Sequence, residues 1–162
     1  GNEALVQRMA AEGHQVGNHT YGHTRLQNAD DQTILTEVAK TDTLLRELLG
    51  DGVYWLRPPY GQISQRGRTL VQVPMIQWTV DPQDWKLLNA DKDYQAVMQA
   101  VEPGSVILMH DFYPASVDAA LRVVDTLQVQ GYTFVTVEEL FTLTGAEAKP
   151  GCLYRAPGKA GY

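Results

Sequence analysis

Histidines at positions 19 and 23 are the side chains of this sequence whose type and spacing most clearly suggest chemistry. An i,i+4 spacing brings two imidazoles to one side of a helical turn or tight loop, where both could bind one divalent ion. Two ordinary surface or core histidines would give the same spacing, so the pair alone does not define a site. A zincin site is excluded because Thr20 stands where that motif needs a catalytic Glu.

Three further side chains and one backbone turn could take part in a reaction beside such a pair. His110 could act as a general acid, because an unperturbed imidazole has a pKa of about 6.5. Asp84 could hold His110 or Arg57 by a charge-assisted hydrogen bond. Arg57 precedes two prolines and could orient a carboxylate, whereas the backbone N–H groups of Tyr60 and its neighbour could face an oxyanion. Each of these residues also has an ordinary structural explanation at a turn, a sheet edge or the surface.

Aromatic side chains and a second aspartate lie in the same stretches of sequence. Trp85 and Tyr60 could form the floor of a sugar groove, although aromatic residues are more often simply packed. Asp81 precedes a proline, which favours a role in a turn over a role in catalysis. His14 stands at the start of its predicted strand, and we interpret it as structural.

The elements that must position these residues alternate between helix and strand. We expect helices at about 3–12, 29–49, 64–72, 91–101, 116–130 and 137–144, and strands at 14–18, 53–56, 75–80, 105–109 and 132–136. This alternation is typical of a parallel α/β sheet or barrel, in which sites form at the C-terminal ends of strands. Polar clusters at 19–23, 57–61, 81–85 and 110–111 each follow a predicted strand. We therefore expect all four clusters at one edge of the sheet. Residues 145–162 are predicted to be a loop or a frayed end.

The composition limits the class of partner. The 162 residues are 44% hydrophobic and 20% charged, which is usual for one globular domain. The formal net charge of −6, without any block of Lys or Arg, argues against nucleic acid or an anionic membrane as partner. No apolar run approaches membrane-spanning length. Cys152 is the single cysteine, which excludes an internal disulfide and a cysteine-cluster metal site.

The four clusters together resemble the motifs of the polysaccharide deacetylase family, the NodB-homology or carbohydrate esterase family 4 domain. The resemblance runs from about residue 2 to residue 144. We take residues 1–144 as the domain and 145–162 as a C-terminal tail. The matching stretches are His19-Thr20-Tyr21-Gly22-His23 (His-(Ser/Thr)-x-x-His), Arg57-Pro58-Pro59-Tyr60 (Arg-x-Pro-Tyr), Asp81-Pro82-Gln83-Asp84-Trp85 (Asp-x-x-Asp-Trp) and Leu108-Met109-His110 (Leu-x-His).

The resemblance implies a distorted (β/α) barrel with fewer than eight strands, and metal-dependent removal of acetyl from N-acetylglucosamine units. His19 and His23 would hold Zn²⁺, or else cobalt, manganese or nickel. By the same resemblance, His110 would protonate the leaving amine, the Tyr60 N–H would donate to the oxyanion, and Leu108 would line the acetyl pocket. Arg57 would orient the catalytic base, and Asp84 would tune its charged neighbours. Trp85 stays a candidate for contact with the sugar.

One family motif has no counterpart in this sequence. The family's first motif is an Asp-Asp pair that supplies the catalytic base and the third metal ligand, and nothing like Thr-Phe-Asp-Asp occurs here. Asp30 and Asp31 follow the histidine pair and open a helix, so they are poor substitutes. We expect the family's first βαβ unit to be missing from this chain. Either an N-terminal fragment or second chain supplies both carboxylates, or the chain is a truncated piece.

The expected substrate is an N-acetylated glycan, with peptidoglycan preferred, chitin oligomers next and acetylated xylan third. By the same resemblance the protein would work outside the cytoplasm, in the periplasm or at the cell wall. Two alternatives stay open: a non-catalytic sugar-binding remnant, and a glycoside hydrolase that uses Asp81 and Asp84. A serine hydrolase is disfavoured because Ser64, Ser105 and Ser116 lie in no nucleophile-elbow pattern.

Overall fold

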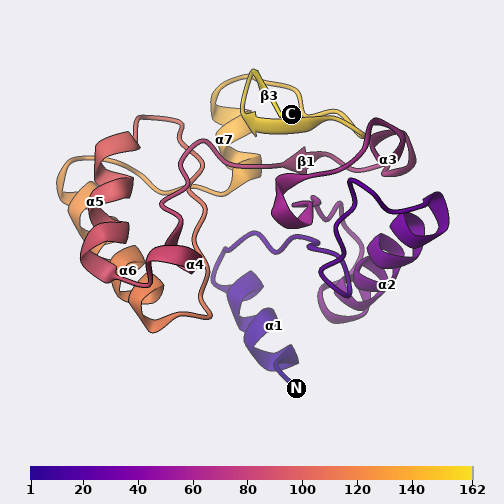
Figure 1. Cartoon of the computed structure of the whole chain (residues 1–162), viewed down its shortest axis with the longest axis horizontal. Helices are drawn as coiled ribbons and strands as arrows, with labels where there is room; N and C mark the ends of the chain where they lie inside the picture. The colour runs from indigo at the N-terminus through magenta and orange to yellow at the C-terminus, as the bar shows by residue number, and fades with distance from the viewer. Residues whose placement is uncertain (162) are drawn as a thin grey trace. The chain divides into compact units, whose positions relative to one another are not determined.

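The computed structural model describes residues 1–161, which form two compact units (Figure 1). The larger unit joins Gly1–Gln77 to the C-terminal segment that begins at Thr136, and the smaller unit is Trp78–Val135. The composition led us to expect one domain with a separate tail. The chain divides differently because its C-terminal segment belongs to the same unit as its N-terminal half.

The C-terminal segment forms strands, so its prediction as a loop or frayed end was wrong. The sheet has the order β1 (Met75–Ile76), β2 (Leu153–Ala156), β3 (Lys159–Ala160). Strand β2 runs parallel to β1, with Met75 opposite Leu153, and antiparallel to β3. Leu153 and Ala156 are buried, which gives the segment an apolar contact that its Gly- and Lys-rich composition hides.

The other expected strands of the larger unit are reduced to single parallel bridges. Leu56 bridges Asn18 on one side and Met75 on the other, and Leu26 bridges Ile63. The segments that end at Asn18 and Leu56 are therefore neighbours, with Asn18 N–H donating to Trp55 O at 2.8 Å. This pairing brings the residues that follow each segment, His19 and Arg57, to the same edge, as the parallel arrangement predicted.

The helices of the larger unit begin where the sequence offers caps. The N-cap of the longest helix is Asp30, which accepts from Thr33 N–H at 2.7 Å. Ser64 and Thr136 cap two others, the latter in a capping box. The helices are α1 (Glu3–Ala11), α2 (Asp31–Leu49), η1 (Pro59–Gly61), α3 (Gln65–Leu70) and α7 (Val137–Leu143). The core between them contains Leu26, Ile34, Leu56, Ile63, Val71, Met75 and Leu153.

The smaller unit packs two helices over one parallel bridge. Its helices are α4 (Asp84–Leu87), α5 (Ala90–Ala100) and α6 (Pro114–Val129), and α5 lies beside α6 (Figure 1). Val80 bridges Ile107, and the core contains Val80, Val97, Val123 and Leu127. Helix α4 forms between the strand predicted at 75–80 and the helix predicted at 91–101, where no element was expected. No strand forms at 132–136, which has no ladder partner among residues 1–161.

No helix within residues 1–161 combines the length and the apolar character needed to cross a membrane.

Candidate metal and catalytic site

The two histidines of the larger unit lie side by side. Their ring centroids are 5.0 Å apart, at an interplanar angle of 69°. The Nδ1 atom of His19 lies 2.5 Å from the backbone oxygen of Arg57, on the neighbouring segment. Because a carbonyl oxygen only accepts, Nδ1 carries the hydrogen and Nε2 carries the lone pair. A backbone carbonyl that fixes the tautomer in this way is a common feature of metal-binding histidines.

A buried asparagine positions the segment that carries His19. The amide oxygen of Asn18 accepts the N–H of Thr20, and its amide nitrogen donates to Val38 O, each at 2.9 Å. Asn18 is 2% exposed, so these bonds are shielded from water. The sequence motif singled out the two histidines but not Asn18, which ties them to helix α2. An asparagine at the end of a strand is a weak signal that could have indicated this role.

The histidine pair sits on a loop, not on a turn of helix. Thr20 and His23 have left-handed backbone angles, with φ of 63° and 55°. Such angles cost energy for residues other than glycine, and they occur where the surrounding structure holds the backbone. Part of that restraint comes from the Glu37 carboxylate, which accepts the N–H of Gly22 at 2.7 Å. Of the two geometries that the spacing allowed, the tight loop is the one formed.

Tyr60 lies against His23 with an equally unusual backbone. Its φ is 59°, and its ring centroid lies 5.0 Å from that of His23. The N–H of Gly61 donates to Pro58 O at 2.9 Å. The Tyr60 N–H is therefore the donor of this turn that could meet an oxyanion, as the motif predicts.

Arg25, which we did not single out from the sequence, covers the same tyrosine ring. Its guanidinium carbon lies 3.9 Å from the Tyr60 centroid, and its Nη1 donates to Gln62 Oε1 at 2.8 Å. His23 and Arg25 thus both contact one aromatic ring. The available sequence signal was an arginine two residues after a histidine of the metal motif.

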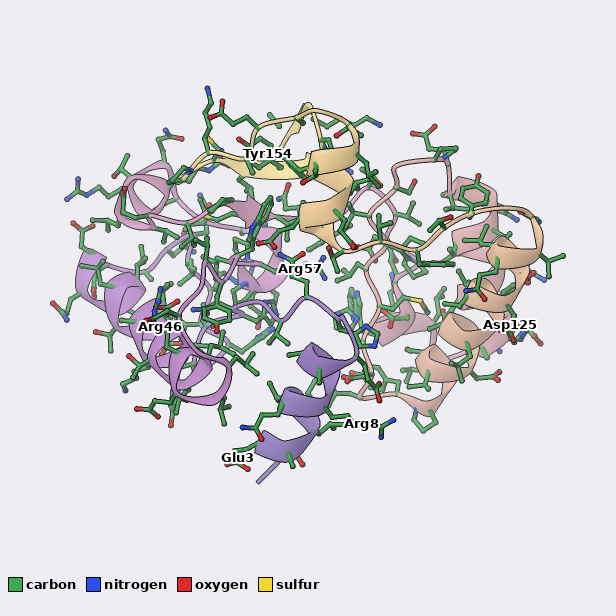
Figure 2. The ribbon with its side chains drawn as sticks, turned by 180° about the vertical axis from the view of Figure 1, so that it is seen from behind. Glu3, Arg8, Arg46, Arg57, Asp125 and Tyr154 are labelled. Atoms are coloured by element: carbon green, nitrogen blue, oxygen red, sulfur yellow. The ribbon has the colours of Figure 1, made fainter. Side chains whose placement is uncertain are left out.

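Arg57 is half-buried in the larger unit, whereas Arg8 and Arg46 lie on α1 and α2 (Figure 2). Its Nη2 donates to Gln77 O at 3.5 Å, and its buried Nε has no hydrogen-bond partner within residues 1–161. Burial lowers the pKa of the Arg57 guanidinium from its usual range. No carboxylate of the described residues pairs with it. A half-buried guanidinium in this state has the capacity to bind an incoming carboxylate.

The imidazoles fit a divalent ion as two of its ligands. Neutral imidazole nitrogen is a common zinc ligand, and catalytic zinc sites use three protein ligands with one open position. Within residues 1–161, no group of three or more His, Cys, Asp or Glu side chains could hold a metal ion. These residues therefore supply the donor set only in part.

In the smaller unit, Asp84 binds His110. The Asp84 carboxylate accepts from His110 Nδ1 at 2.8 Å and from its backbone N–H at 2.6 Å. Of the two partners expected for Asp84, the structure thus gives it His110. With Nδ1 engaged, Nε2 is the nitrogen through which the ring can exchange a proton. Asp81 accepts the N–H of Gln83 at 2.9 Å, which is the turn role that we expected.

One buried acidic residue near this pair, Asp93, was not predicted. Asp84 and Asp93 are both 0% exposed, and neither carboxylate oxygen of Asp93 has a hydrogen-bond partner within residues 1–161. Burial and then the nearby Asp84 charge raise the pKa of Asp93. Burial also opposes ionisation of Asp84, but the hydrogen bonds from His110 outweigh it and lower the pKa of Asp84. The available signal was that Asp93 lies one helical turn before the buried Val97, on the apolar face of α5.

The remaining predicted site residues also lie in the smaller unit. Leu108 is buried, and Trp85, next to Asp84, is half exposed. Their expected roles in an acetyl pocket and a sugar groove stay predictions. The structure therefore brings together His19, His23, Tyr60 and the backbone of Arg57 in one unit, and Asp84 with His110 in the other.

Known proteins resemble this chain in sequence and in structure. Residues 1–73 match the family model described as polysaccharide deacetylase. Over 140 residues the chain is 34% identical to the Listeria monocytogenes protein named peptidoglycan-N-acetylglucosamine deacetylase PgdA, covering 86% of this chain and 30% of that protein. The chain thus spans less than a third of that relative's length.

Two solved structures give the same result. A structure described as T48 deacetylase with substrate is 37% identical with a TM-score of 0.87, covering 94% of this chain and 75% of that one. A family 4 acetyl xylan esterase from Clostridium thermocellum, in complex with a cobalt ion, is 28% identical with a TM-score of 0.88, covering 96% and 78%. The fold is therefore the NodB type that the motifs implied, and the chain belongs to the polysaccharide deacetylase family, carbohydrate esterase family 4.

Proposed function

We propose that this protein removes the N-acetyl group from N-acetylglucosamine units of a polysaccharide in a reaction that depends on a divalent metal. The observation that carries the proposal is the adjacent imidazole pair, in which the Arg57 carbonyl fixes the tautomer of His19. A ring held in one tautomer presents a lone pair for coordination without further rearrangement. The family to which the chain belongs supports the class of reaction.

Each group of residues would carry a different task in this reaction. His19 and His23 would hold the ion, whose chemistry is to polarise the acetamide carbonyl and to activate the attacking water. The Tyr60 N–H would donate to the oxygen that becomes negative. His110 would donate its Nε2 proton to the leaving amine, and Asp84 would favour the protonated imidazole while that proton is held. Leu108 and Trp85 would contact the acetyl group and the sugar.

We further propose that the third metal ligand and the catalytic base come from an Asp-Asp segment outside these 162 residues. The segment would lie either in an N-terminal fragment or on a second chain. Two observations support this: the buried Arg57 Nε has no partner, and no three-ligand metal group exists within residues 1–161. A buried unpaired donor is costly, and a carboxylate would satisfy it.

Peptidoglycan is the substrate that we propose first, followed by chitin oligomers and then acetylated xylan. The name of the Listeria relative supports peptidoglycan as the first choice. Such a substrate would place the protein outside the cytoplasm, in the periplasm or at the cell wall. Zinc is the proposed metal, with cobalt, manganese and nickel as alternatives; the cobalt ion in the Clostridium esterase supports a divalent site.

The structure weakens the glycoside hydrolase alternative. That mechanism needs two carboxyl groups on either side of the scissile bond. Asp81 is engaged in its own turn, and Asp84 is fully buried beneath His110. Asp84 is therefore shielded from a sugar, which leaves the exposed Asp81 without the second carboxyl group that this mechanism needs. The sugar-binding alternative differs from the leading proposal in needing no imidazole pair.

Acetate and reducing ends, measured on N-acetylglucosamine oligomers, test these functions together. We expect the full-length protein to release acetate and to create no new reducing ends. His19→Ala and His23→Ala should each abolish that release while oligomer binding persists. New reducing ends would support a hydrolase of the glycosidic bond. Binding without acetate release, unchanged by both substitutions, would support a lectin-like domain.

A further inference from the structure

Arg25 differs from the ion-paired arginines of this chain. Its guanidinium rests on the Tyr60 ring and donates to the neutral Gln62, and it pairs with no carboxylate within residues 1–161. Arg25 is also exposed. By contrast, each of Arg8, Arg46, Arg66 and Arg122 pairs with a carboxylate.

The residue that follows Arg25 fixes the position of the Arg25 backbone. Leu26 is fully buried and bridges Ile63 in parallel, so Arg25 and Gln62 immediately precede two bridged residues on neighbouring segments. That register explains why the Gln62 amide oxygen reaches the guanidinium. The face of Tyr60 supplies a second support through a cation–π contact. Arg25 is therefore oriented before any ligand binds, which reduces the entropy lost on binding.

Arg25 also lies close to the proposed metal ligands. Tyr60 contacts both groups: its ring centroid lies 5.0 Å from that of His23 and 3.9 Å from the guanidinium carbon of Arg25. A glycan whose acetamide is bound at His23 would bring its neighbouring substituents toward Arg25. The guanidinium has five N–H donors, and Gln62 takes one at Nη1. The remaining donors suit a two-pronged interaction with a carboxylate.

We propose that Arg25 binds a carboxylate of the glycan substrate and makes this site selective for anionic N-acetylated glycans, such as those that contain muramic acid. The proposal rests on the function proposed above and deepens it by naming the charged group that is recognised. The net charge of −6 repels an anionic polymer in general, so selectivity for one requires a local cation at the site.

Binding of three tetrasaccharides tests the proposal directly. The first alternates N-acetylglucosamine with N-acetylmuramic acid and carries free lactyl carboxylates; the second is its methyl ester; the third is chitotetraose. By isothermal titration calorimetry, the unmodified protein should bind the acid about tenfold more tightly than either neutral compound, as expected for a charged hydrogen bond. Added salt should reduce that preference.

Substitutions separate the role of Arg25 from general charge. Arg25→Gln should bind all three compounds alike, and Arg25→Lys should keep only part of the preference because an ammonium lacks the planar fork. Arg8→Gln is the matched control, since Arg8 is an exposed arginine paired with Glu12 on α1, and it should keep the full preference.

Two outcomes would overturn the proposal: an unmodified protein that does not prefer the acid to its ester, including one that binds neither, or an Arg25→Gln variant that keeps the preference. Acetate release, measured on the same compounds, reports separately on the proposed function. A protein that prefers the acid through Arg25 but releases no acetate would contradict the deacetylase and leave the carboxylate site standing.

Discussion

At the scale of single residues, the candidate chemistry depends on hydrogen bonds that fix two imidazoles. The Arg57 carbonyl sets the tautomer of His19, and the Asp84 carboxylate does the same for His110. The first arrangement suits a metal ligand, and the second suits a group that accepts and donates protons. The spacing of the histidines indicated the first, whereas only the folded chain reveals which partner Asp84 takes.

Replacement of Asp84 tests its role with His110. Asp84→Asn keeps the size of the side chain but removes the charge that favours the imidazolium, so kcat should fall by about a hundredfold or more while KM changes little. The ratio of the two constants distinguishes loss of proton transfer from loss of binding. Asp81→Asn, in the neighbouring turn, is the matched control and should retain most of the activity. A similar fall in both variants would contradict the assigned role.

At the scale of elements, helix α5 carries an aspartate, Asp93, whose carboxylate oxygens have no hydrogen-bond partner within residues 1–161. Asp93 is fully buried, and burial together with the Asp84 charge raises its pKa. A carboxyl group with a higher pKa in the folded state binds its proton more tightly when folded. Its stabilising contribution is therefore complete below the unfolded pKa of about 4 and is lost as pH rises through the folded pKa.

Asp93→Asn should stabilise the protein at neutral and alkaline pH. The amide cannot ionise, so the free energy of unfolding should rise by roughly 1–3 kcal/mol there, with a smaller gain near pH 4. Urea unfolding across this pH range measures the difference. Asp91→Asn is the control, because Asp91 is exposed and pairs with Arg122 at the surface. A gain that does not depend on pH would contradict an ionisation effect.

Strand β2 is the second element whose role was not predictable from composition. Leu153 is 3% exposed and lies opposite Met75 in the sheet, so Leu153→Ala should lower the free energy of unfolding by about 2–5 kcal/mol. Leu143→Ala, at a site 73% exposed, should change it by about 0.5 kcal/mol or less. Equal effects would mean that the C-terminal strand contributes little to the larger unit.

At the scale of the whole molecule, the sequence predicted most helices and the clusters of polar residues that follow strands. It did so because helix caps and apolar periodicity are local signals. The apolar pattern also predicted the extended segments that contain Asn18, Leu56 and Met75, although they pair over only one or two residues. Strand β2 was missed because it depends on a partner far away in sequence. Left-handed angles at Thr20, His23 and Tyr60 also come from tertiary restraint, so local propensity did not reveal them.

The central claim is that the imidazoles at positions 19 and 23 hold a metal ion that the reaction requires. Acetate release from N-acetylglucosamine oligomers, measured on the full-length protein before and after chelation, tests it most directly. We expect chelation to abolish release, added Zn²⁺ to restore it, and His19→Ala to prevent that restoration. Acetate release at an unchanged rate after complete removal of metal would contradict the claim.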